Sequence, residues 1–211
     1  MISILNLFYI IASSLAIISL SFPVITDIIA RRKKIRFSGD LKLFELYNFF
    51  TLIMQILAVI FAKLLFTSNL ILFRIYLPFH TAIFTYFLVK WRGNNNYLIW
   101  SVVFFFISIV GEFFLGKHGT PPNFMIWFDA IVLLVLSFNL NLYIDKKKLL
   151  LKKENNYIFT GIYLYSIITI IGISPSSTEL RTYGFFFQSI AIIVSSYFYA
   201  GSFQCLFRSN G

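Results

Sequence analysis

Seven runs of about 20 mostly apolar residues fill almost the whole chain, and this feature limits the fold more than any other. An α-helix needs about 20 such residues to cross about 30 Å of hydrocarbon, so each run has the length of a transmembrane helix. Pro23 follows the first run, and because a proline kinks a membrane helix without necessarily ending it, a continuation to Ala30 stays open. The runs cover residues 2–22, 44–66, 69–90, 97–115, 124–144, 156–174 and 180–205.

The composition agrees with a chain that lies in lipid. Hydrophobic residues make up 59% of it and charged residues only 12%, which is half the usual proportion of a soluble protein. The connections between the runs are short, so sequence neighbours should be antiparallel neighbours in space. We therefore predict an all-α polytopic membrane protein, in which residues 1–211 form a single seven-helix transmembrane bundle, monomeric or oligomeric.

The distribution of the cations predicts the orientation of the bundle. Fourteen of the 18 Lys and Arg residues lie in the connections after the first, third and fifth runs or in the C-terminal tail. The positive-inside rule places these segments in the cytoplasm, with the N-terminus outside and the C-terminus inside. The first run has basic residues after it and none before it, which is the reverse of a cleaved signal peptide, so we expect a retained helix.

Two of the inner connections are densely basic, at 31–36 and at 146–153. Such segments can bind anionic lipid headgroups or an acidic cytoplasmic protein partner. A nucleic acid could bind them as well, but their role in topology already accounts for these segments without any such partner, and we do not expect a nucleic-acid partner.

Polar residues gather on one side of several predicted helices and should face the bundle interior, because lipid cannot satisfy them. At about 100° per residue, Ser101, Ser108 and Glu112 fall within about 40° of one another, and a longer stripe on the last run contains Arg181 and Gln188. A stripe on the second run contains Glu45, Asn48, Thr51, Gln55 and Lys63.

Five charged residues come near the outer ends of their predicted helices, namely Lys63, Arg74, Glu112, Asp129 and Arg181. Pairing of Glu112 or Asp129 with Arg74 would lower the cost of burying them. These charged residues either form ion pairs that fix the packing of the helices or belong to a ligand or ion site, and both interpretations stay open. His80, near the middle of its run, is either a proton carrier or pH switch or a side chain bonded to a neighbouring helix. The candidates for a ligand site or for intramembrane ion pairs are Lys63, Arg74, His80, Glu112, Asp129, Arg181 and Gln188.

Several chemistries lack their residues. The last run contains no lysine for a retinal Schiff base, and Cys205 is the single cysteine. Only His80 and His118 could serve as histidine ligands, and they are far apart in depth, which argues against a zinc hydrolase. Gly172-Ile173-Ser174 is followed by no histidine, as a serine nucleophile would require. We expect no catalytic residues, no metal and no cofactor, and hence no enzyme.

Two pairs of similar segments suggest an internal repeat. Glu45 and Glu154 each precede a Phe-Thr-x-Ile sequence by five residues, and Arg74 and Arg181 each begin an Arg-x-Tyr-x-x-Phe sequence. The offsets along the chain nearly agree. They are compatible with two parallel three-helix units joined by a fourth helix, a plan known from small solute carriers.

Short motifs carry a resemblance to a known family. Ser68-Asn69-Leu70, Phe73-Arg74-Ile75-Tyr76, the Phe-rich fourth run and Gly161-Ile162-Tyr163-Leu164-Tyr165 together resemble an uncharacterised family of small seven-span bacterial membrane proteins, over most of residues 44–205. This resemblance implies a multi-pass protein of the bacterial inner (plasma) membrane. The chain departs from the family at Phe73-Arg74-Ile75-Tyr76 and Pro78-Phe79-His80, in the third run, where the family usually carries a glutamate after His-x-Tyr.

Two function classes remain. The first is a non-enzymatic membrane sensor or regulator with an outward-facing polar site for a small, anionic ligand. The alternative is a small-solute transporter or a pore, including a membrane accessory or effector protein of an antiviral system. Three cations near the outer ends and no catalytic set motivate the sensor. We prefer it to the transporter because no ion-coordinating or broken-helix pattern marks a transport site.

Overall fold

The computed structural model describes residues 4–33, 35, 37–61, 70–115, 123–173 and 178–209. Its regular elements are seven α-helices, which confirms the all-α class for this part of the chain. They are α1 (Ile4–Arg32), α2 (Gly39–Val59), α3 (Leu70–Trp91), α4 (Tyr97–Leu115), α5 (Asn123–Lys147), α6 (Lys153–Ile173) and α7 (Thr178–Ser209).

Six of these helices are long and apolar enough, within the described residues, to cross a membrane. The mean hydropathy of the candidate spans runs from 1.3 to 2.3 and is highest in α4. α6, with 21 residues, is not among the six. Several helices of this length and composition fit a protein that is embedded in a membrane. The six spans are Ser14–Arg32, Gly39–Val59, Ile71–Trp91, Tyr97–Leu115, Phe124–Lys147 and Ser189–Leu206.

The first helix continues through Pro23 and ends at Arg32, so the predicted end at 22 was wrong and the open alternative holds. A proline removes one backbone donor, and an apolar helix of 29 residues can lose one bond without ending. The hydroxyl of Thr26 lies 2.9 Å from the carbonyl oxygens of both Phe22 and Pro23, beside the proline turn.

The second helix starts at Gly39, five residues before the apolar run at 44. Ser38 caps it, because the Leu41 amide donates to the Ser38 hydroxyl at 3.4 Å. The sequence prediction followed apolarity and therefore missed a polar first turn that contains Asp40. The predicted residues 62–66 of this helix lie outside the described part of the chain.

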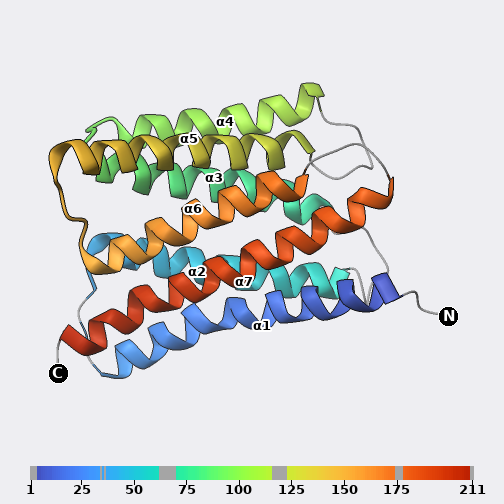
Figure 1. Ribbon diagram of the computed structural model, residues 1–211, viewed down its shortest axis with the longest axis horizontal. Coiled ribbons are helices and arrows are strands. Elements are labelled where there is room, and N and C mark those ends of the chain that lie inside the picture. Colours follow the sequence, from blue (N-terminus) through green and yellow to red (C-terminus); the bar gives the residue numbers. More distant parts are fainter. Residues whose placement is uncertain are drawn as a thin grey trace. The chain divides into compact units, whose positions relative to one another are not determined.

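The contacts divide the chain into two compact units. The first unit is Met1–Asn48 with Lys152–Gly211, and in it α7 packs against both α1 and α6 (Figure 1). The second unit is Phe49–Leu151, in which α3, α4 and α5 all pack against one another. The single bundle and the internal repeat stay predictions.

In the first unit, α6 and α7 pack closely because two glycines each receive an aromatic ring from the other helix. A Cβ added to Gly161 would lie 2.5 Å from Cε1 of Tyr199, and one added to Gly201 would lie 2.8 Å from Cδ1 of Tyr157. Small residues of this kind allow membrane helices to approach closely, and van der Waals contact then stabilises the pair.

The Tyr199 ring has little room to move away from Gly161. Its side chain is buried, and its edge meets the fully buried Phe44 ring of α2 at a centroid distance of 4.9 Å. Phe44 also stacks on Phe203 at 6.2 Å. The N-terminal part of α2 is thus tied to α7 within this unit.

Gly161→Ala is therefore expected to destabilise the first unit. Overpacking costs about 1–3 kcal/mol, against a gain of about 1 kcal/mol in helix propensity, so the thermal midpoint in detergent should fall. Gly39→Ala is the control, because nothing lies within 4 Å of its added Cβ, and it should leave the midpoint unchanged or raise it. Equal effects of the two substitutions would contradict the packing described for Gly161.

Candidate functional site

The interior of the second unit is polar on the side of α4. Among the described residues of α4, the only buried ones are Ser101, Ser108 and Glu112, while its many apolar side chains are exposed. This confirms the predicted inward orientation of the polar stripe. An apolar exterior and a polar interior are what a helix in contact with lipid requires.

The first polar cluster joins the ends of three helices, and we call it the Glu112 cluster. It comprises Arg74 in the second turn of α3, Glu112 in the last turn of α4 and the backbone amide of Met125 in the first turn of α5. Glu112 Oε1 lies 3.5 Å from Nε of Arg74, and the Met125 amide donates to Glu112 Oε2 at 3.4 Å.

The surroundings of the Glu112 carboxylate are positively polarised, as they are around a bound anion. The carboxylate faces a guanidinium on one side and, on the other, the N-terminal turn of α5, where the helix dipole favours negative charge. The Glu112 side chain is 6% exposed and that of Arg74 is 29% exposed, so the cation is the accessible partner.

Gly111 allows this arrangement, because a Cβ at this position would overlap the ring of Phe124. The first turn of α5 therefore packs directly on the backbone of α4, beside Glu112. Phe124 in turn stacks on Phe128 of its own helix, at a centroid distance of 5.6 Å.

The second polar cluster joins α3 to α5 further along both helices, and we call it the Asp129 cluster. His80 Nδ1 lies 2.9 Å from Asp129 Oδ1, and the Thr81 hydroxyl lies 2.7 Å from the same oxygen. Asp129 Oδ1 thus takes two partners from consecutive residues of α3. All three residues are buried, since His80 and Asp129 are 1% exposed and Thr81 is 0% exposed.

The surroundings of the Asp129 cluster are aromatic. The Phe84 and His80 rings meet edge to face with a centroid distance of 4.6 Å, and the centroid of the Tyr76 ring lies 5.4 Å from that of His80. The Thr81 hydroxyl is also 3.0 Å from the carbonyl oxygen of Leu77 in its own helix, so its one hydrogen has two acceptors. The result is a closed polar connection between two helices.

The structure brings four of the predicted site residues together in two pairs. Arg74 pairs with Glu112, which is one of the two expected pairings, whereas Asp129 bonds His80 and Thr81 rather than Arg74. His80 therefore bonds a neighbouring helix. Lys63 lies outside the described residues, and Arg181 and Gln188 lie in α7, with side chains outside the described part.

A third charged cluster, in the first unit, was missed by the sequence reasoning. Arg31 contacts Glu45 of α2, and its Nε lies 3.6 Å from Oδ2 of Asp27, one turn earlier in α1. Both carboxylates are buried, with exposures of 1% for Asp27 and 5% for Glu45. The signal was available, since an acid in an apolar run followed four residues later by arginine is a helical ion pair.

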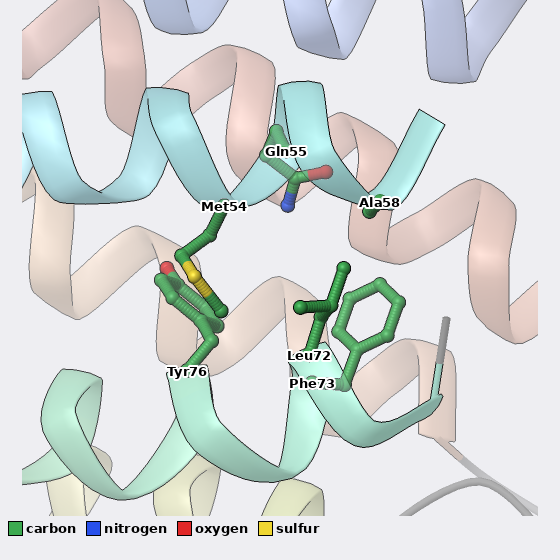
Figure 2. A pocket seen from close by; sticks show the side chains of 6 residues that line it. All are labelled: Met54, Gln55, Ala58, Leu72, Phe73 and Tyr76. Atoms are coloured by element: carbon green, nitrogen blue, oxygen red, sulfur yellow. The ribbon is translucent and has the colours of Figure 1, made fainter. Parts of the chain in front are cut away.

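A small apolar hollow lies between α2 and α3 within the second unit (Figure 2). Met54, Gln55 and Ala58 line it from α2, and Leu72, Phe73 and Tyr76 line it from α3. Its buried core is Met54, Ala58 and Leu72, and none of the charged residues named above lines it. It therefore has little of the polarity that an ionic ligand would need.

Metal ligation finds no support in the described residues, where no three His, Cys, Asp or Glu side chains form a group that could hold an ion. Comparisons with protein families, with curated proteins and with solved structures find no match to this chain.

Removal of the Asp129 carboxylate should strongly destabilise the second unit. Asp129→Ala leaves His80 and Thr81 without their common acceptor, and we expect the free energy of unfolding to fall by about 2–4 kcal/mol. The double variant with Thr81→Ala should show a coupling energy of about 0.5–3 kcal/mol in a thermodynamic cycle. Asn141→Ala, at an exposed position of the same helix, is the control. Strictly additive effects of Thr81→Ala and Asp129→Ala would contradict the shared hydrogen bond.

Proposed function

We propose that the protein is a non-enzymatic sensor or regulator of the bacterial inner membrane, with an outward-facing polar site for a small anionic ligand. In this proposal all seven helices cross the membrane, with the N-terminus outside and the C-terminus inside. The cation distribution supports this orientation through the positive-inside rule. The resemblance to small seven-span bacterial membrane proteins supports the localisation.

The observation that carries the proposal is the exposure of Arg74. Its guanidinium is 29% exposed at the end of the second unit where α3 begins, and its carboxylate partner is buried. In the proposed orientation this end faces outward, so an anion arriving from outside would meet the cation first. Arginine binds carboxylate and phosphate groups through paired donors, which makes it suited to recognition of an anion.

The same helices offer a route to the cytoplasmic side. α3 carries Arg74 near its start and Lys90 in its last turn, and α5 runs from the Glu112 cluster to Lys146 and Lys147 in its last turn. A shift of either helix on ligand binding would reach the basic inner connections. These connections would contact anionic lipid headgroups, a cytoplasmic protein partner or a second copy of the chain.

Binding at Arg74 predicts a specific change in thermal stability. The purified protein in detergent should be stabilised by at least one anion in a panel that includes acetate, succinate and phosphate. At a concentration of 100 times Kd the gain is about 2.7 kcal/mol. Arg74→Ala should abolish this gain, whereas Arg92→Ala, an exposed residue beyond the opposite end of α3, should retain it. A full gain in Arg74→Ala, or no stabilising anion at all, would contradict the proposal.

A second candidate, a small-solute transporter or pore, is favoured by the serines of α7. Ser189, Ser195, Ser196 and Ser202 are all buried in the first unit. Ser195 and Ser202, however, donate to backbone carbonyl oxygens of their own helix, which also suits plain helix packing.

The transporter predicts solute or ion flux in proteoliposomes that Gln188→Leu reduces, since this substitution removes a polar group from the predicted stripe of α7. Protein-free liposomes and Ser21→Ala, at a half-buried position of α1, are the controls. Absence of flux across a broad panel of solutes would leave the sensor as the function.

A further inference from the structure

Glu112 is held by donors from two helices other than its own. One is the guanidinium of Arg74 on α3, and the other is the amide of Met125 at the start of α5. A cationic side chain combined with an N-terminal helix amide is the donor set with which proteins bind free carboxylates and phosphates. The geometry therefore has the form of an anion site in which the anion is a side chain of the protein.

The contacts to this side chain are longer than those of an optimal anion site. The distances are 3.5 Å to Arg74 Nε and 3.4 Å to the Met125 amide, whereas charge-assisted hydrogen bonds are about 2.7–2.9 Å. Oε1 of Glu112 is buried and accepts no hydrogen bond in the described structure. A free carboxylate can approach the same donors without the restraint of the α4 backbone, so it could make shorter contacts.

We propose that Arg74 and the Met125 amide form a carboxylate-binding site that Glu112 occupies as an internal, displaceable ligand. The external ligand is a small organic carboxylate, whose two oxygens replace Oε1 and Oε2 of Glu112. The claim of an external ligand rests on the proposed function, whereas the internal occupation does not. Glu112 lies in the last turn of α4.

Displacement would change how the three helices are held together. With Glu112 in place, α4 is tied to both α3 and α5 by one carboxylate. With a free carboxylate in its place, α3 and α5 stay joined through the ligand, and α4 loses its polar contact with both while its packing against them remains. The Asp129 cluster does not involve α4 and continues to link α3 with α5. The ligand would therefore loosen the last turn of α4 relative to the other two helices.

Chemical rescue tests the internal occupation. Glu112→Ala empties the site, and the thermal midpoint of the full chain in detergent should fall by about 4 °C or more. Sodium formate should restore most of this loss, while sodium chloride at the same ionic strength should not. The double variant Arg74→Ala/Glu112→Ala should not respond to formate. Asp129→Ala is the matched control, because it also removes a buried carboxylate but from a cluster with no accessible cation.

Glu112→Gln separates charge from volume. The amide fills the site but carries no charge, so the midpoint should fall and formate should not restore it. Where Glu112→Ala does not fold, Glu112→Ser replaces it, since its small neutral side chain also leaves room for formate. No rescue of Glu112→Ala or Glu112→Ser, or equal rescue of Asp129→Ala, would overturn the inference.

The outcomes also distinguish the inference from the proposed function. If formate rescues Glu112→Ala but no anion stabilises the wild-type protein, the internal site is supported and the proposed sensor function is contradicted. An anion that stabilises the wild-type protein through Arg74, with no rescue of Glu112→Ala, supports the sensor and overturns the internal ligand.

Discussion

The need to satisfy polar groups away from lipid organises the second unit. α4 has the highest mean hydropathy of the candidate spans, yet its buried residues are two serines and a glutamate. Water would drive its apolar side chains inward, whereas lipid accepts them and leaves the interior to groups that need partners. Glu112 finds its partners on α3 and α5, and these contacts, together with the packing of Phe124 on Gly111, hold the three helices at that end.

The helices could be predicted from the length of the apolar runs, because length and apolarity are the properties that allow a helix to cross the hydrocarbon layer of a membrane. The α4 boundaries agree at both ends, whereas α1 continues through Pro23 and α2 begins with a polar turn before its apolar run. Thr26 beside Pro23 and the cap by Ser38 are local hydrogen bonds, and hydropathy contains no information about them. The Gly161–Tyr199 contact depends on the tertiary approach of two helices, so no local pattern could reveal it.

The candidate site was predicted in part, for a related reason. The order of the charges along antiparallel helices placed Arg74 at one depth with Glu112 and Asp129, which limited the expected partner of Arg74 to these two acids. It could not choose between Glu112 and Asp129, because the choice depends on which side of α3 each neighbour covers. Asp27 was overlooked because Arg31 was assigned to topology alone, although a cation can mark the inner side and also hold two buried carboxylates.

The two clusters of the second unit differ in a way that bears on function. The Asp129 cluster is closed, with every member at most 1% exposed and contacts of 2.7–2.9 Å, and a ligand has no exposed group to recognise there. The Glu112 cluster has longer contacts and one partly exposed cation, so exchange of its anion costs less. The two clusters lie about one turn apart on α5, so the contact at Glu112 could change while the Asp129 cluster keeps α3 and α5 joined. The proposed sensor would depend on this difference, since a ligand changes an equilibrium only through contacts that differ between its two states.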